Sequence, residues 1–112
     1  MKYAVAVNPA SGNEIARYQL ASGEEIAAVV ERAGRAFEAW RCTGFEERTE
    51  LMSRVADVLE ANADRWARLM TDEVGKPIAE SRAEISKCAW VCRYYAAEAE
   101  RMLADRHIES GR

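Results

Sequence analysis

Two short stretches of alternating apolar and polar positions open the chain and predict a β-hairpin. The stretches are 3–7 and 14–20, and both are rich in β-branched, aromatic or small residues at every second position. The residues between them, 8–13, include two asparagines, a proline and a glycine, which are turn-forming types. We therefore predict two antiparallel strands over 3–7 and 14–20.

Helical spacing begins directly after the second strand. Ser22, followed three residues later by Glu25, forms a capping-box signature, and apolar residues then recur every three or four positions. The first predicted helix therefore runs from about 23 to 40. The positions of its apolar stripe are Ile26, Val29, Val30, Ala33, Phe37 and Trp40.

A second and longer helix is predicted after Thr43, which repeats the capping-box signature together with Glu46. A single apolar stripe continues from there as far as Glu73, and Gly75 is placed to cap the C-terminus of this helix. The stripe consists of Leu51, Val55, Val58, Leu59, Asn62, Trp66, Leu69 and Met70.

A third helix is predicted from Pro77 to about Asp105, since proline suits the first position of a helix. It carries two apolar stripes, and a helix that is apolar over so much of its girth needs neighbours on more than one side. The first stripe consists of Ile78, Ile85, Cys88, Ala89, Cys92, Tyr95, Ala96, Ala99, Met102 and Leu103, and the second of Trp90, Val91 and Tyr94.

The third predicted helix is too long for a self-contained domain of this size. At about 1.5 Å per residue it measures roughly 43 Å, whereas a compact chain of this length is only about 34 Å across. In an elongated helical hairpin, Trp90, Val91 and Tyr94 would form an exposed apolar patch, and such patches mark binding surfaces. We therefore expect the chain to be part of something larger, or to self-associate, through these three residues.

Composition narrows the choice of partners and compartment. With 112 residues, 49% hydrophobic and 31% charged, the chain is one globular domain at most. Its net charge of -3 and the absence of a dense basic run argue against nucleic acid and anionic membrane as partners. No apolar run is long enough for a signal peptide or a membrane span, and three cysteines are an odd number, so we expect a cytoplasmic protein with free thiols.

Residues that carry chemistry are scattered rather than assembled. The six glycines lie at least ten residues apart, so they form no phosphate-binding loop. His107 lies beyond the last helical stripe and has no cluster of cysteines or carboxylates around it. Cys88 and Cys92 stand four apart, but they are better explained as small buried hydrophobes than as metal ligands. We therefore predict no catalytic residue, no cofactor-binding residue and no metal site.

Five sequence blocks stand out along the chain: Asn8-Pro9-Ala10-Ser11-Gly12 with Ile15-Ala16, then Phe37-Glu38-Ala39-Trp40, then Glu47-Arg48, then Glu73-Val74-Gly75-Lys76-Pro77-Ile78-Ala79-Glu80, and then Arg93-Tyr94-Tyr95-Ala96. In their order and spacing these blocks resemble the N-terminal region of NAD(P)-dependent aldehyde dehydrogenases. Lys87-Cys88-Ala89, which leads into the last block, and Ala104-Asp105 after it are most similar to the succinate-semialdehyde dehydrogenase branch. The resemblance covers nearly the whole chain.

The resemblance implies an α+β piece of an α/β cofactor-binding domain, in which residues 1–112 form a hairpin and three helices of a truncated protein. The complete enzymes use NAD or NADP to oxidise an aldehyde to a carboxylic acid through a thioester on a nucleophilic cysteine. The family's nucleophile, general base and dinucleotide-binding glycines come from later segments, so none of them maps onto this chain. Lys87 corresponds to a helical turn that borders the substrate tunnel in relatives, which makes it a candidate substrate-tunnel residue.

A second hypothesis, from a different class, is a stand-alone helical interaction module without catalysis. In that case the face formed by Trp90, Val91 and Tyr94 would bind a partner helix or a second copy of the chain. Both hypotheses predict that the isolated chain is inactive, and both assign a binding role to the same exposed face. They differ in whether the partner is the remainder of an aldehyde dehydrogenase.

Overall fold

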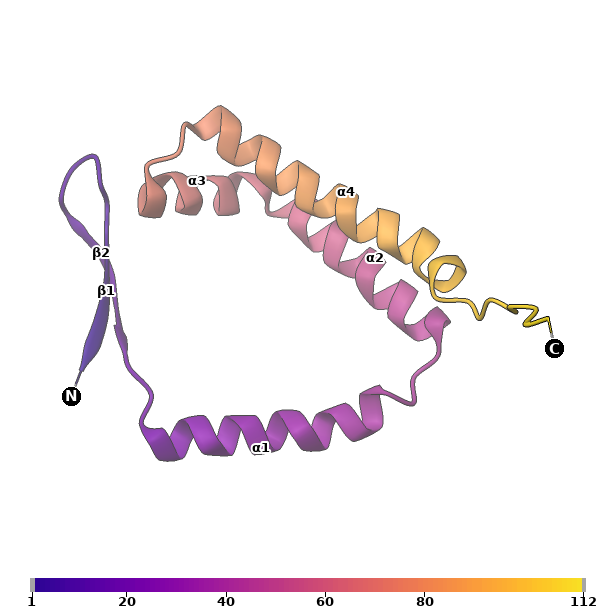
Figure 1. Cartoon of the computed structure of the whole chain (residues 1–112). Helices are drawn as coiled ribbons and strands as arrows, with labels where there is room; N and C mark the ends of the chain where they lie inside the picture. The colour runs from indigo at the N-terminus through magenta and orange to yellow at the C-terminus, as the bar shows by residue number, and fades with distance from the viewer. Residues whose placement is uncertain (1, 112) are drawn as a thin grey trace.

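The structure is a computed structural model that describes residues 2–111 as a two-stranded hairpin followed by four helices (Figure 1). In chain order the elements are β1 (Tyr3–Val7), β2 (Glu14–Gln19), α1 (Gly23–Trp40), α2 (Phe45–Ala61), α3 (Ala63–Val74) and α4 (Ile78–Met102). The predicted class, a hairpin followed only by helices, is confirmed. The second predicted helix, however, is divided into α2 and α3.

The hairpin closes through its asparagine-rich turn. The Asn8 side-chain oxygen accepts the N–H groups of Ala10 (2.9 Å) and Ser11 (3.2 Å), and the Asn8 N–H donates to the Asn13 carbonyl (2.9 Å). Gly12 adopts a positive φ of 76°, which a glycine accepts without steric cost. The strands then pair antiparallel, with a register irregularity at the end of β1. The turn residues thus supply the local geometry that the sequence predicted.

Both halves of the first predicted capping box form at the N-terminus of α1. The Glu25 N–H donates to the Ser22 hydroxyl (3.2 Å), and the Ser22 N–H donates to the Glu25 carboxylate (2.7 Å). These two bonds satisfy donors that have no partner within the helix. They account for the beginning of α1 at the predicted residue.

We predict that acid frays the start of α1 through Glu25. The hydrogen bond from the Ser22 N–H lowers the pKa of Glu25 from its ordinary value of 4.5. Because the folded pKa lies below the unfolded one, this stabilisation is complete above about pH 4.5 and is lost as the pH falls through the lower, folded pKa. Amide NMR signals of residues 23–28, followed from pH 6 to pH 3, should show this loss. Glu25→Gln should abolish it while Glu24→Gln retains it, and identical curves for both variants would refute the prediction.

Asn62 interrupts the helix that was predicted to run without a break to Glu73. Its side-chain amide donates to the Val58 carbonyl (2.9 Å), which also accepts the Asn62 backbone N–H (3.2 Å), and its φ and ψ of -114° and 18° are not helical. Its own carbonyl then accepts the Trp66 N–H (3.1 Å), so the same residue ends α2 and begins α3. The prediction of one continuous helix is wrong because asparagine hydrogen-bonds to nearby backbone and competes with the helix.

The second predicted capping box is also wrong. Helix α2 begins at Phe45 with Gly44 at its N-cap position, and no side chain caps it. The Thr43 hydroxyl instead donates back to the Trp40 carbonyl (2.8 Å) and accepts the Arg48 Nε–H (2.9 Å). Thr43 therefore joins the end of α1 to α2 rather than starting a helix.

Helices α2 and α3 both pack against α4 (Figure 1). The buried side chains lie along these contacts and are almost all small: Ala56 of α2, Ala67 of α3, and Ser81, Ile85 and Ala89 of α4. Among the described residues, Ile85 is the one large aliphatic side chain in this core. Since each large buried side chain contributes about 1.5 to 3 kcal/mol, this core stabilises the helices only weakly.

The described chain is open rather than compact. Its radius of gyration is 20.0 Å and its extents are 67 × 40 × 29 Å, whereas a compact domain of this length has a radius of gyration of about 13 Å. Its accessible surface is 9280 Å², against roughly 6200 Å² for a folded monomer of this mass. This open shape agrees with the expectation that the helices extend beyond a self-contained domain. The hairpin, α1 and the packed helices α2, α3 and α4 enclose an open arc (Figure 1).

Candidate functional site

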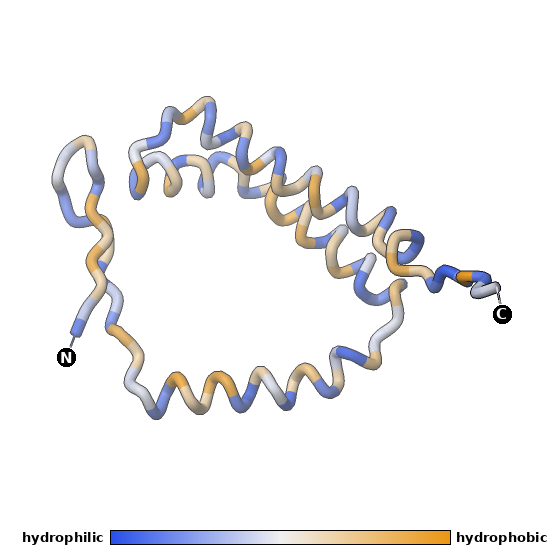
Figure 2. The backbone as a smooth tube through the Cα atoms, in the orientation of Figure 1, coloured by the Kyte–Doolittle hydropathy of each residue, from blue (hydrophilic) through white to orange (hydrophobic). Residues whose placement is uncertain are grey.

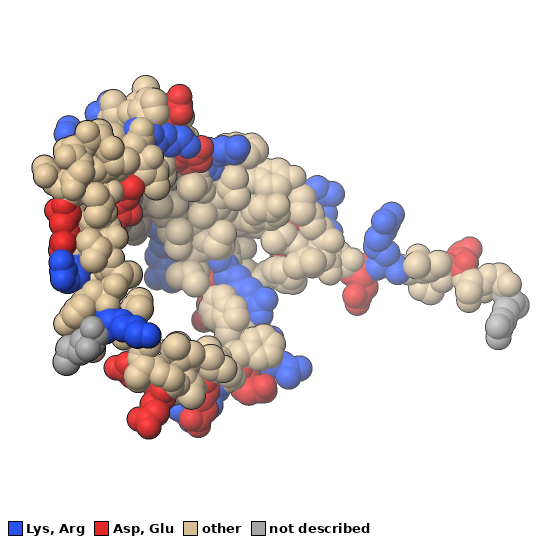
Figure 3. Space-filling model, turned by 60° about the vertical axis from the view of Figure 1, so that its left-hand side comes forward, with Lys and Arg blue, Asp and Glu red and all other residues tan. Residues whose placement is uncertain are grey.

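Helix α1 presents an apolar face that nothing in the described chain covers. None of its residues is buried, and Val30, Phe37 and Trp40 are 65%, 57% and 41% exposed. In Figure 2 the hydrophilic residues of α1 lie on its lower side, and Figure 3 shows acidic side chains gathered along that same edge. The apolar side therefore points toward the open arc. We call the stripe Ile26, Val29, Val30, Phe37 and Trp40 the α1 face.

Helix α4 carries a second uncovered face, built from aromatic residues. Trp90 is 62% exposed, and it stacks on Tyr94 with ring centroids 5.8 Å apart. Tyr94 in turn meets Tyr95 edge-on at 5.3 Å. We call Trp90, Tyr94 and Tyr95 the α4 face. Val91, which the sequence grouped with Trp90 and Tyr94, is half-buried, so it does not share their full exposure.

Hydrogen bonds and ion pairs hold α4 so that its aromatic face points outward. Arg93 bridges to Asp57 (2.9 Å) and Glu60 (2.6 Å) of α2. The Thr49 hydroxyl donates to the Ala96 carbonyl at 3.1 Å, and so links α2 to α4 within the half-buried interface. Exposed ion pairs contribute little free energy, but together with Thr49 they define which side of α4 meets α2. These contacts fix the rotation of α4 relative to α2, with Trp90 and Tyr94 left exposed.

The turn between α3 and α4 holds the hairpin close to the helices. Gly75 caps α3 in the left-handed conformation, with a φ of 71°. A Cβ at Gly75 would lie only 2.9 Å from the Cγ of Pro9 in the hairpin turn. The following Lys76 donates to the Glu84 carboxylate at 2.7 Å and ties the turn to α4. Two features therefore require glycine at this position: the positive φ of its backbone and the close approach of Pro9.

Lys87, the predicted substrate-tunnel residue, lies exposed on α4 about one turn after Glu84. It makes no ion pair within residues 2–111, although its charge acts on Glu84. The hydrogen bond from Lys76, with the charges of Lys76 and Lys87, holds the pKa of Glu84 below its ordinary value. Lys87 is thus an exposed cation on the surface of α4.

The cysteines form no cluster that resembles a reactive centre. Cys42 and Cys88 are exposed and Cys92 is half-buried, all as free thiols, so the interpretation of Cys88 as a buried hydrophobe is wrong. Cys88 faces outward because Ile85 and Ala89 already occupy the packed side of α4. Within residues 2–111, no group of three or more histidine, cysteine or acidic side chains lies close enough to hold a metal ion.

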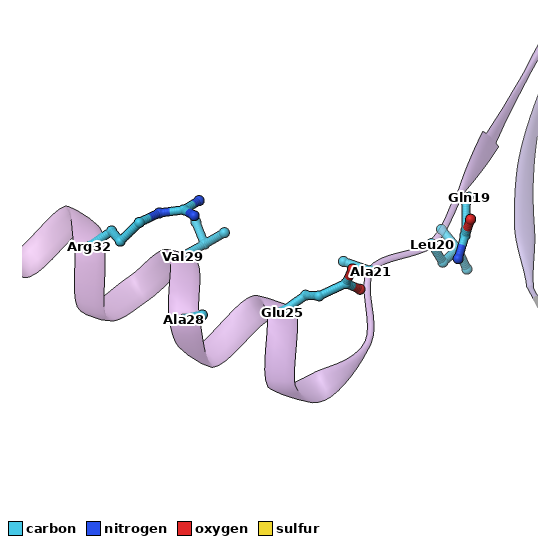
Figure 4. Close-up of a pocket in the computed structure, with 7 residues that line it drawn as sticks. All are labelled: Gln19, Leu20, Ala21, Glu25, Ala28, Val29 and Arg32. Carbon is cyan, nitrogen blue, oxygen red and sulfur yellow. The ribbon is translucent and has the colours of Figure 1, made fainter.

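A shallow hollow lies where β2 leads into α1 (Figure 4). One of its polar side chains, Glu25, is engaged in the capping box, and its apolar part includes Val29 of the α1 face. It therefore continues the uncovered surface rather than forming a site for chemistry. The residues that line it are Gln19, Leu20, Ala21, Glu25, Ala28, Val29 and Arg32.

Sequence reasoning missed the α1 face. It identified the stripe of α1 but had no reason to expect it to remain uncovered, because a packed helix and an unpacked one have the same periodicity. It identified the exposure of Trp90 and Tyr94 because the length of the third predicted helix exceeded the size of a compact domain. No helix within residues 2–111 is both long and apolar enough to cross a membrane.

Known proteins match this chain over nearly its whole length. The family model for the aldehyde dehydrogenase family matches residues 2–112. A curated relative named succinate-semialdehyde dehydrogenase [NADP(+)] 1, from Mycobacterium tuberculosis, is 41% identical over 106 residues, or 95% of this chain and 23% of its own length. A probable succinate-semialdehyde dehydrogenase [NADP(+)] from Synechocystis is 41% identical over 91% of this chain and 22% of its own length.

Solved structures share the fold as well as the sequence. An NADP-dependent enzyme from E. coli superposes with a TM-score of 0.87 at 31% identity, and covers 98% of this chain and 23% of its own. An NADP-dependent glyceraldehyde-3-phosphate dehydrogenase from Bacillus halodurans, solved with NADP, gives a TM-score of 0.85 at 30% identity, with 89% of this chain and 21% of its own covered. The chain thus spans about a quarter of the length of the proteins it matches. It corresponds to the N-terminal portion of these enzymes, and it belongs to the aldehyde dehydrogenase family.

Proposed function

We propose that this chain acts as the N-terminal segment of an NAD(P)-dependent aldehyde dehydrogenase of the succinate-semialdehyde type, which oxidises an aldehyde to a carboxylic acid. The observation that carries the proposal is 41% identity to a succinate-semialdehyde dehydrogenase across 95% of this chain. The open shape supports it, because an accessible surface of 9280 Å² exceeds that of a self-contained monomer by roughly 3000 Å².

The segment's contribution is structural. The α1 face and the α4 face are the apolar surfaces that the remainder of the enzyme would cover, with Trp90 and Tyr94 as the largest side chains on α4. The small core of the segment buries little apolar surface. Covering the two faces would remove more apolar surface from water and so stabilise the segment. The half-buried Val91 contributes at the edge of the same surface.

The described residues do not fit a nucleotide. A dinucleotide phosphate is bound by a glycine-rich loop at a helix N-terminus, where backbone N–H groups and the helix dipole favour negative charge. Here each helix has an acidic residue in its first turn, which repels phosphate: Glu24 and Glu25 in α1, Glu46 and Glu47 in α2, Asp64 in α3 and Glu80 in α4. Cofactor binding and the covalent chemistry would therefore belong to other parts of the enzyme.

We predict that the isolated chain neither binds NAD or NADP nor oxidises aldehydes. Calorimetric titration with each nucleotide should show no saturable heat, and mixing the chain with an aldehyde and either nucleotide should produce no absorbance of reduced cofactor. The relative's full-length enzyme serves as the positive control for both assays. Saturable binding at micromolar nucleotide would overturn the assignment of a purely structural role.

Lys87 is proposed to lie at the border of the substrate tunnel in the assembled enzyme. Its exposed ammonium, which forms no ion pair among residues 2–111, suits it to attract a carboxylate-bearing aldehyde. In the assembled enzyme, Lys87→Met should raise KM for a carboxylate-bearing aldehyde more than KM for an uncharged one. Equal effects on both substrates would remove Lys87 from the proposal.

The alternative is a stand-alone helical interaction module. It is favoured by the aromatic α4 face, since exposed apolar patches on small proteins mark binding surfaces. The two functions differ in the partner they require. An interaction module would bind through the α4 face alone, whereas an enzyme segment needs the α1 face as well.

A further inference from the structure

Helix α1 is joined to the other helices at a single corner. It packs against none of them along its length, and all of its residues are exposed. Among residues 2–111, the hydrogen bond from Arg48 Nη2 to the Trp40 carbonyl (3.0 Å) is the one that links α1 to another helix. At its C-terminal end, the direction of α1 relative to α2 is therefore set at the turn formed by residues 41–44, while its N-terminal end follows the hairpin, whose turn lies against Gly75.

The side chain of Arg48 spans this corner with a fork of donors. Its Nη2 donates to the last carbonyl of α1, and its Nε donates to the Thr43 hydroxyl at 2.9 Å. The Thr43 hydroxyl and the Thr43 N–H also donate to the Trp40 carbonyl, at 2.8 and 3.1 Å. The Trp40 carbonyl thus accepts three hydrogen bonds. The planar guanidinium of Arg48 holds its two acceptors, this carbonyl and the Thr43 hydroxyl, in one fixed geometry.

Charge and an aromatic ring add to the same contact. The guanidinium lies over the Trp40 ring, 5.4 Å from its centroid. It also lies at the C-terminus of α1, where the helix dipole is negative and no basic residue of α1 itself is present in the last turn. Arg48 is half-buried, so its interactions are less screened than those of the fully exposed arginines.

We propose that Arg48 is a positioning residue that fixes the direction of α1 and keeps the α1 face turned toward the open arc. Apart from the bonds of Arg48, the hydrogen bonds of residues 41–43 run back three or four positions to residues 37–40, so they shape the turn but do not reach α2. Without Arg48, the direction of α1 would be set only by the backbone of residues 41–44 and by the hairpin at its other end. This role of Arg48 does not depend on the proposed enzyme, because it concerns the chain alone.

The test measures the distance between α1 and α4 by pulsed electron paramagnetic resonance. Spin labels replace the exposed residues Ala28 and Ser86 in a chain whose native cysteines are changed to serine, diluted tenfold with unlabelled chain to suppress intermolecular distances. The parent should give a narrow distance distribution, and Arg48→Met should broaden it at least twofold. Arg54→Met, which removes an exposed arginine from the same helix, should leave the distribution unchanged.

A second variant decides the matter if Arg48→Met loses helical circular dichroism. Thr43→Val removes the hydroxyl that accepts from Arg48 and donates to Trp40, and it changes no charge. Broadening in Thr43→Val with unchanged helical content supports the proposal. A broad distribution in the parent, or variants as narrow as the parent, would overturn it.

Discussion

Gly75→Ala is expected to destabilise the docking of the hairpin on the helices by about 2 to 5 kcal/mol. Two costs add at this position. A side chain in the left-handed conformation costs roughly 1 to 2 kcal/mol, and φ at Gly75 is 71°. The new Cβ would also lie 2.9 Å from Pro9 Cγ, an overlap that requires the turn to shift and that costs about 1 to 3 kcal/mol when the surroundings are packed. Urea unfolding, followed by hydrogen exchange of the hairpin amides, measures the loss.

Gly12→Ala is the matched control for Gly75→Ala. Gly12 has nearly the same φ, 76°, but a Cβ there would meet nothing within 4 Å. It should therefore show the backbone cost alone. In the Pro9→Ala background, which removes the Cγ, Gly75→Ala should lose no more than Gly12→Ala does. Equal losses for the two glycines in the unmodified chain would contradict the contact between Gly75 and Pro9.

The double substitution Trp90→Ser with Tyr94→Ser is expected to dissociate oligomers of the isolated chain and to raise its solubility. The two rings are 62% and 40% exposed and stack on each other rather than on a core. Burying each against a second copy contributes roughly 1.5 to 3 kcal/mol, so their removal weakens association by several orders of magnitude in dissociation constant. Sedimentation velocity over a concentration series measures the change.

Ile85 provides the contrast on the same helix. It is 7% exposed and faces the packed side of α4, so Ile85→Ala should cost about 2 to 5 kcal/mol of stability while leaving any association unrelieved. For the double variant, the helical circular dichroism should be retained. A sharp, reversible melt of a monodisperse monomer by the unmodified chain, lost in the double variant, would show that the rings belong to a core.

The sequence predicted those parts of the fold that depend on contacts between residues close together along the chain. The Ser22–Glu25 box and the turn around Asn8 use partners within five residues, so local pattern was sufficient. The break at Asn62 was missed because an asparagine on an apolar stripe was counted as helical. Its amide bond to Val58 is local too, but it competes with the helix rather than continuing it.

The Thr43 prediction failed for a different reason. Its hydroxyl has two options, an N-cap bond to the following helix or a bond back to the preceding one. The structure takes the second because Arg48 occupies the corner and completes the network. That choice depends on the angle between α1 and α2, which the spacing of apolar residues along the sequence does not determine.

The candidate site was predictable only in part. The exposure of Trp90 and Tyr94 followed from the length of the third predicted helix, whereas the uncovered α1 face and the Gly75–Pro9 contact depend on the path of the whole chain. Family membership came from sequence motifs in their order and spacing rather than from an assembled site. Lys87 remains a prediction.

The central claim, that both apolar faces are built to be covered by the remainder of an aldehyde dehydrogenase, is tested most directly by fragment complementation. The chain is mixed with the part of the Mycobacterium tuberculosis relative that follows its matching segment, and NADP⁺ reduction by succinate semialdehyde is measured along with hydrogen exchange in α1. We expect a one-to-one complex, activity only in the mixture, and slowed exchange at Val30 and Phe37. A chain that stays a stable monomer, with α1 exchange unchanged by the added segment, would contradict the account.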